Sequence, residues 1–238
     1  MKKVLKGILK SLGYQVNKYH EEDKMKMLRQ FGINKLFDVG ANIGQYGLEV
    51  RRIGYDKKII SFEPMKAAYN VLEQASAKDN NWVINNYALG NENMESEINV
   101  AGNSYSSSIL NMLPEHETRA PESKYVAKEK IGIKTLDSIF NNYYEEGDNV
   151  MLKIDTQGFE KNVILGSEKV LDKITLMQLE MSVVALYENE TSFIEMIKFL
   201  DNKGFELFSL ENGFSDEKTG RLLQLDGLFV NKKTGKKF

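Results

Sequence analysis

The chain has 238 residues, of which 42% are hydrophobic and 28% are charged, as in an ordinary globular protein with one substantial core. Its formal net charge of −2 gives no general attraction to polyanions, so we expect no nucleic-acid partner. There is no cysteine, and histidine occurs only at His20 and His116. Disulfides, thiolate nucleophiles and zinc–thiolate sites are therefore excluded, and we expect no metal site.

The amino-terminal segment, residues 1–30, is predicted to be a helical extension of a main domain at residues 31–238. Its first part carries apolar residues at helical spacing between lysines: Val4, Leu5, Ile8, Leu9 and Leu12. We expect a short helix packed on the domain, and the alternative is contact with a membrane surface through residues 1–12. No apolar run approaches the roughly 20 residues that a membrane-spanning helix needs, so we expect a cytoplasmic protein without a transmembrane segment.

From about residue 35, short apolar runs alternate with helical patterns, which predicts βαβ units and a parallel sheet. The five runs span Lys35–Val39, Lys58–Glu63, Trp82–Ala88, Val150–Asp155 and Ile174–Glu180. They are nearly continuously apolar, as expected for strands that helices cover on both faces. Such sheets bind ligands beyond the carboxyl ends of their strands, so the polar residues that end these runs are candidates for a site.

Helical patterns fill the intervals, over Gln45–Ile53, Met65–Lys78, Leu136–Tyr144, Phe159–Leu171 and Ser192–Lys203. Two further strands, Phe205–Leu210 and Arg221–Val230, follow without a helix between them, which predicts a terminal antiparallel hairpin. The stretch Gly90–Lys130 is polar and is predicted to be a loop insertion over the strand ends. Within it, Gly102–Glu129 is expected to be more mobile without ligand, and the hydroxyl-rich stretch Tyr105–Ser108 is a candidate pocket lining.

The loop after the first predicted strand reads FDVGANIGQYG, Phe37–Gly47. Gly40 and Gly44 permit a tight turn and a close approach of a ligand to the backbone. The G-x-G-x-x-G spacing of dinucleotide-binding loops is absent, because Asn42 occupies the second glycine position. Asp38 is poorly suited to a pyrophosphate and suits an ammonium group, such as the methionyl end of S-adenosylmethionine. The loop therefore favours S-adenosylmethionine over a dinucleotide.

The second predicted strand ends in SFEP, where Glu63 lies 25 residues after Asp38 (63 − 38). An acidic residue about 20 residues beyond the first loop hydrogen-bonds a ribose in folds of this kind. Pro64 ends the strand and can open the following helix. Glu63 is therefore the expected ribose ligand, and a solvated acid at a strand end is the structural alternative.

The fourth predicted strand continues into LKIDTQGFE, Leu152–Glu160. Asp155 lies at its carboxyl end, and Lys153 points to the same face because it is two residues earlier. An amine beside a carboxylate can orient or deprotonate a substrate hydroxyl, so both are candidate catalytic residues. A structural ion pair is the alternative. Glu180, which ends the fifth predicted strand, is the third catalytic candidate.

As a set, these motifs resemble those of the FkbM family of methyltransferases. The resemblance runs from about Phe37 to Val230 and is carried, in the family's order, by FDVGANIGQYG, SFEP, NNYALG, the SSS run, KTLD, LKIDTQGFE, LMQLE and LDGLFV. It implies S-adenosylmethionine as methyl donor and O-methylation of a hydroxyl on a sugar, glycan or natural-product-like small molecule. It also implies a class I methyltransferase fold, a Rossmann-like α/β fold. Five parallel strands and the C-terminal antiparallel hairpin then form one doubly wound sheet in the order 3-2-1-4-5-7-6.

By matching motifs, the resemblance implies a cofactor site made of Asp38, Gly40, Asn42, Gly44, Glu63, Pro64, Asn86 and Ala88. The family's fourth-strand motif often reads D-V-E-G-F-E, whereas this chain has D-T-Q-G-F-E, so Gln157 stands where an acid is common. Residues 31–238 are accordingly expected to be the methyltransferase domain. Two alternatives remain: a non-catalytic S-adenosylmethionine-binding or assembly module, and an NAD-dependent oxidoreductase, against which the first loop argues.

Overall fold

A computed structural model describes residues 21–216 and 218–234, so the helix predicted within residues 1–12 lies outside the described residues. The core element is a seven-stranded sheet in the order β3-β2-β1-β7-β8-β10-β9. Its strands are β1 (Lys35–Val39), β2 (Lys58–Phe62), β3 (Trp82–Asn85), β7 (Val150–Ile154), β8 (Ile174–Ser182), β9 (Phe205–Asn212) and β10 (Gln224–Asn231). Neighbouring strands from β3 to β8 pair in parallel, whereas β10 is antiparallel to both β8 and β9. The predicted strand order and terminal hairpin are confirmed for this sheet.

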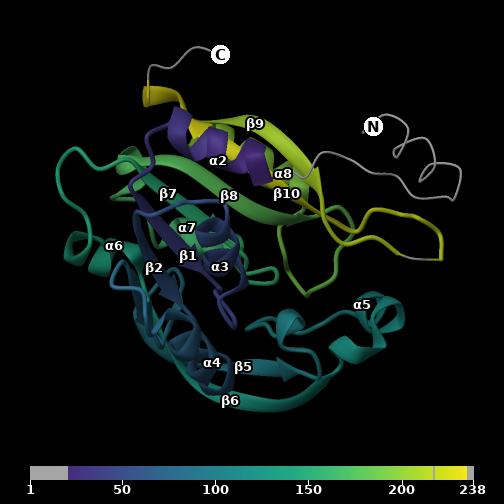
Figure 1. The fold of residues 1–238 in the computed structure, drawn as a ribbon. Coiled ribbons are helices and arrows are strands. Elements are labelled where there is room, and N and C mark those ends of the chain that lie inside the picture. Colours follow the sequence, from purple (N-terminus) through teal and green to yellow (C-terminus); the bar gives the residue numbers. More distant parts are fainter. Residues whose placement is uncertain (1–20, 217, 235–238) are drawn as a thin grey trace, which may run out of the picture.

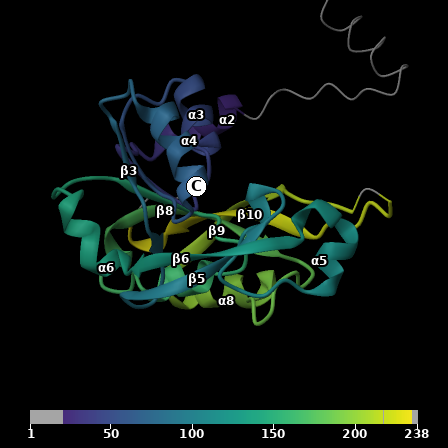
Figure 2. The same ribbon diagram turned by 90° about the horizontal axis from the view of Figure 1, so that it is seen from below.

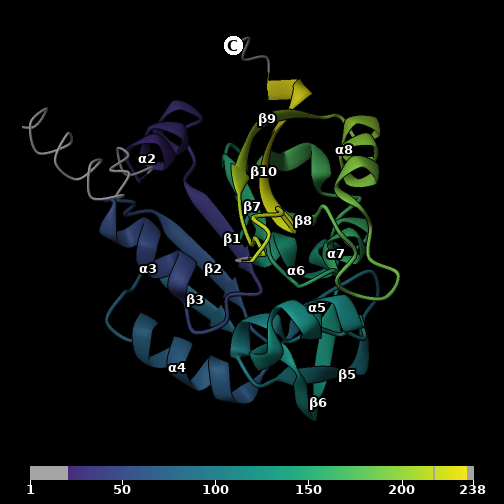
Figure 3. The same ribbon diagram turned by 90° about the vertical axis from the view of Figure 1, so that its right-hand side faces the viewer.

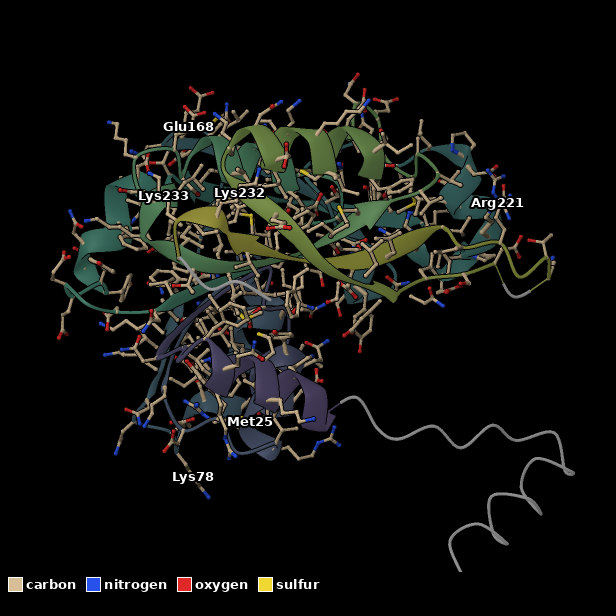
Figure 4. All side chains as sticks on the ribbon, turned by 90° about the horizontal axis from the view of Figure 1, so that it is seen from above. Met25, Lys78, Glu168, Arg221, Lys232 and Lys233 are labelled. Carbon is tan, nitrogen blue, oxygen red and sulfur yellow. The ribbon has the colours of Figure 1, made fainter. Side chains whose placement is uncertain are left out.

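Helices cover both faces of the sheet, which makes the fold doubly wound (Figure 1). On one side lie α2 (Glu21–Gln30), α3 (Gln45–Arg52) and α4 (Lys66–Ser76), and on the other α6 (Leu136–Ile139), α7 (Glu160–Leu165) and α8 (Phe193–Asn202), as Figure 3 shows. The two faces have separate cores because side chains alternate along a strand: Leu36 packs with α2 and α3, and Phe37 packs with α6 and α7. Figure 4 shows Lys78, after α4, and Glu168, after α7, projecting from opposite faces.

Two predicted helices are shorter than their apolar patterns suggested. The first stops at Ile139 and continues as a 3-10 turn, Phe140–Asn142. The second, α7, ends at Leu165, and Gly166 follows it in close contact with another loop: a Cβ there would lie 1.9 Å from the carbonyl oxygen of Gly90. Gly166 is itself a local signal for a helix end, because glycine is a weak helix former.

A second sheet corrects the prediction of a loop insertion at residues 90–130. Its strands are β4 (Ala88–Leu89), β5 (Met94–Ala101) and β6 (Tyr125–Lys134), in the order β4-β6-β5, with α5 (Pro114–Arg119) between β5 and β6. The run predicted as one strand at residues 82–88 is divided, because β3 pairs in the large sheet and β4 in the small one. The region is polar because much of β5 and β6 faces solvent, and an antiparallel sheet tolerates one wet face.

The small sheet packs against the start of α4, below the carboxyl ends of the parallel strands in Figure 1 (see also Figure 2). Met65 and Ala68 contribute to this packing together with Ile98, Ile131 and Ile133. The described part of the predicted extension, α2, belongs to the main core through Met27 and Leu28. Among residues 21–216 and 218–234, no helix has the length and apolar character that crossing a membrane requires.

Candidate active site

A cavity of about 420 Å³ lies at the carboxyl ends of the parallel strands. Of the residues predicted from sequence, eight line it: Gly40, Asn42, Glu63, Pro64, Ala88, Lys153, Asp155 and Glu180. Ser104, Tyr105 and Ser107 close it from the small-sheet side, so the hydroxyl-rich stretch does line the pocket. Asp38, Gly44 and Asn86 are outside the lining. These three contact the residues that line the cavity or shape the loops around it.

The first loop is shaped by two glycines with positive φ. Gly40 has φ 74°, and a Cβ on it would lie 1.8 Å from the carbonyl oxygen of Asp155, so the loops after β1 and β7 touch at this point. Gly44 has φ 91° at the start of α3, where a Cβ would lie 2.9 Å from Leu72 and 3.3 Å from Trp82. Only glycine combines a positive φ with the lack of a Cβ that both positions need, and of the two Gly40 lines the cavity.

Glu63 ties the first two loops together. One carboxylate oxygen accepts the backbone N–H of Asn42 at 2.8 Å, and the other accepts that of Met65 at 2.8 Å. Asn86 supports the same turn, since its side-chain amide donates to the carbonyl oxygens of Glu63 and Pro64 at 2.9 and 3.0 Å. Burial raises the pKa of Glu63 to about 7, although the two backbone hydrogen bonds act in the opposite direction. The carboxyl group is thus buried, oriented and poised to ionise near neutral pH.

Asp38 is fully buried and forms an ion pair with a lysine side chain of the same chain. The Ser61 hydroxyl donates to one of its oxygens at 3.2 Å, and the Lys153 ammonium lies 3.3 Å from the other. The Lys153 ammonium also lies 3.4 Å from Asp155. Burial alone would lower the pKa of Lys153, but Asp155 and Asp38 hold it above its ordinary value. Sequence reasoning placed Asp38 against the ammonium of a cofactor, and in this structure the ammonium beside it is that of Lys153.

Carboxyl groups form a row across the far end of the cavity. Asp155 follows β7, Glu180 lies on β8, and Asp226 on β10 pairs with both Glu180 and Glu211 of β9. Burial, followed by the charges of Asp155, Glu160 and Asp226, holds the pKa of Glu180 well above its ordinary value. Burial and then Asp155 raise the pKa of Asp226 to about 6. This end of the cavity therefore presents carboxyl groups of which some retain protons near neutral pH.

Asp226 and Glu211 were missed by sequence reasoning. For Asp226, the available signal was an acid inside the mostly apolar run LQLDGLFV, but nothing local says that it faces a cavity. In the part of the chain that the structure describes, no group of three or more histidine, aspartate or glutamate side chains is placed to hold a metal ion.

Comparison with known proteins shows which family the chain belongs to. The model of the Methyltransferase FkbM domain matches residues 38–207, from the buried Asp38 to the start of β9. The chain belongs to the FkbM methyltransferase family. A curated relative, methyltransferase sdnD of Sordaria araneosa, is 24% identical over 200 residues, which are 72% of this chain and 73% of the relative.

The crystal structure of methyltransferase FkbM from Methylobacillus flagellatus KT has the same fold. It is 14% identical with a TM-score of 0.50, and the match covers 82% of this chain but 43% of the other. The chain thus spans less than half the length of that solved relative. The family match runs from the end of β1 to the start of β9 and includes the candidate site residues between them, whereas Asp226 lies beyond it.

Proposed function

We propose that this FkbM methyltransferase transfers a methyl group from S-adenosylmethionine to a hydroxyl on a sugar, glycan or natural-product-like small molecule. The observation that carries the proposal is Glu63, a buried carboxyl that lines the cavity while each of its oxygens accepts one backbone N–H. A carboxylate oxygen can accept a second hydrogen bond, so Glu63 retains acceptor capacity for the two hydroxyls of a ribose.

The residues present fit an adenosyl cofactor. Asn42 lines the cavity, and its side-chain oxygen is buried with no hydrogen-bond partner among the described residues, which is the state of a group that a ligand would satisfy. We assign Gly40, Asn42, Glu63, Pro64 and Ala88 to cofactor binding. We assign Asp38, Gly44 and Asn86 to the support of those residues. When bound, S-adenosylmethionine supplies a methyl group activated by its sulfonium.

The acceptor is assigned to the carboxyl-rich end of the cavity. A hydroxyl must lose its proton when it is methylated, and Asp155 is the first candidate to accept that proton because its side chain is 40% exposed. Lys153 stays protonated between its two carboxylates, so it can orient the acceptor or stabilise negative charge but cannot act as the base. Glu180 is the second candidate for the base. We further propose residues 31–238 as the methyltransferase domain, preceded by the extension at residues 1–30.

Calorimetry with S-adenosylhomocysteine and NAD tests the cofactor. S-Adenosylhomocysteine is expected to bind and NAD is not. Glu63→Ala should weaken S-adenosylhomocysteine binding by about 1–3 kcal/mol, the cost of losing hydrogen bonds to a charged acceptor. Heat from NAD with none from S-adenosylhomocysteine would favour an oxidoreductase instead. Cofactor binding without turnover on a broad panel of hydroxyl acceptors would favour a non-catalytic module.

A further inference from the structure

Gln157 lies between the two candidate bases and contacts both. It follows β7 in the left-handed region, with φ 53°. Its side-chain nitrogen is 3.0 Å from one oxygen of Asp155 and 2.7 Å from one oxygen of Glu180. A primary amide carries two N–H donors on that nitrogen, so it can donate one hydrogen bond to each carboxyl group.

The surroundings of Gln157 fix which end of the amide faces the carboxyl groups. The Tyr187 hydroxyl lies 2.8 Å from the side-chain oxygen of Gln157 and 3.2 Å from the backbone oxygen of Ser106, so it donates its one proton across the shorter contact. The Ser108 hydroxyl donates to the backbone oxygen of Gln157 at 2.7 Å. Tyr187 is buried, and Ser108 belongs to the segment that follows β5. Because the side-chain oxygen is engaged by Tyr187, the nitrogen is directed toward Asp155 and Glu180.

A neutral donor is suited to this position because the region already holds excess negative charge. The side-chain amide of Gln224 also donates to Glu180, at 2.7 Å, and reaches the same oxygen as Gln157 does. The charged groups that act on Glu180 come from β7, α7 and β10: Asp155, Lys153, Glu160 and Asp226. A third carboxylate in place of the Gln157 amide would repel two others at hydrogen-bond distance, whereas the amide supplies two donors and no charge.

On the basis of the proposed function, we propose that Gln157 is a positioning residue of the acceptor subsite. Its amide bridges Asp155 and Glu180 and thereby holds Asp155 in place to accept the proton of the acceptor hydroxyl. Tyr187 orients the bridge, which links the segment after β5 to the candidate base.

The test is a titration that needs neither cofactor nor acceptor. Carbon-13 resonances of the side-chain carboxyl of Glu180 are followed against pH in the wild-type protein, in Gln157→Met and in Gln157→Glu. Gln157→Met keeps the shape and removes both donors, so the Glu180 midpoint should move to higher pH. Gln157→Glu should move it further, by about one pH unit or more, because it adds a neighbouring negative charge. Gln74→Glu, an exposed position on α4, is the matched control and should leave the midpoint unchanged.

A second measurement separates positioning from folding. Tyr187→Phe keeps the ring and removes only the hydroxyl that orients the amide, so it should move the Glu180 midpoint in the same direction by a smaller amount. Melting temperatures identify variants that fail to fold. An unchanged Glu180 midpoint in folded Gln157→Met and Gln157→Glu proteins would overturn the bridge. If the wild-type protein failed to bind S-adenosylhomocysteine while the midpoints moved as expected, the proposed function would fail and the bridge would stand.

The catalytic consequence is measured with the first hydroxyl acceptor that the panel yields. Gln157→Met should lower kcat and shift the pH profile of methyl transfer, while KM for S-adenosylmethionine stays within about twofold of the wild-type value, because the cofactor residues are untouched. If Gln157→Met lowered kcat by the same factor at every pH and left the midpoints of the pH profile unchanged, Gln157 would have only a packing role.

Discussion

We predict that nucleoside binding depends on pH through the buried carboxyl of Glu63. Its pKa rises from 4.5 to about 7 because burial disfavours the charged form. At about 1.4 kcal/mol per pH unit, this difference amounts to about 3 kcal/mol. As the pH rises from 4.5 to about 7, the unfolded chain loses this proton while the folded protein keeps it, so the free energy of unfolding falls. Above pH 7, the ligand-free protein has therefore lost about 3 kcal/mol of its free energy of unfolding through this carboxyl group.

Ribose hydroxyls donate to the ionised form, so binding should release the proton. With a pKa of about 7, roughly one Glu63 in eleven is ionised at pH 6 and ten in eleven at pH 8, so affinity should rise about tenfold between these values. 5′-Methylthioadenosine is the right ligand because it carries the ribose but no titrating ammonium or carboxylate. Calorimetry at pH 6 in two buffers of different ionisation enthalpy should report the release of most of one proton, and at pH 8 almost none.

Two variants complete this experiment. Glu63→Gln should bind more weakly and lose the pH dependence, because the amide does not titrate and its nitrogen must face one of the two backbone N–H donors. Glu73→Gln, at an exposed position of α4, should keep the wild-type profile. An affinity that is constant from pH 6 to pH 8, with no proton released, would refute the assignment of Glu63 as the ribose ligand.

Three further predictions concern the neighbouring loops. Gly40→Ala should destabilise the protein by several kcal/mol, because the added Cβ would lie 1.8 Å from a backbone oxygen. Gly54→Ala, whose Cβ would have no atom within 4 Å, should cost only about 1–2 kcal/mol of backbone strain. Similar melting temperatures for the two variants would contradict this. Burial raises the pKa of Glu160 to about 7, while one of its oxygens accepts hydrogen bonds from Thr156 and Gly158. Glu160→Gln should keep those bonds and stabilise the protein at pH 8 by up to about 3 kcal/mol, but not at pH 4, where the wild-type carboxyl is already neutral. Equal denaturation midpoints of the two proteins at pH 8 would rule this out. Asp155→Asn should retain S-adenosylhomocysteine affinity and lose about 10²–10⁴-fold in single-turnover rate, the usual share of a general base; full turnover in a folded variant would shift the role to Glu180.

The sequence by itself determined the large sheet and the two loops that line the cavity after its first two strands. Five apolar runs and a helix-free terminal pair were enough to predict its strands, because burial on both faces leaves a strong local signal. The positions of Gly40 and Glu63 were predictable for a similar reason, since a tight turn and a strand-end acid are features of a few consecutive residues.

The small sheet was not predicted because its polar, half-exposed strands resemble a loop when each residue is judged by polarity alone. The helix end at Leu165 was missed although Gly166 is a weak helix former, because Val170 and Leu171 continue the apolar pattern beyond it.

Only the tertiary structure decided which charged groups meet. Asp38 holds Lys153 because the register of β1 against β7 places the two residues opposite each other. Asp226 joins the carboxyl row because β10 inserts between β8 and β9. Gln157 faces two acids because Tyr187, thirty residues later, holds its side-chain oxygen. Side-chain periodicity shows on which face of the sheet a residue lies, but strand order and register decide which residues of the adjacent strands lie beside it on that face.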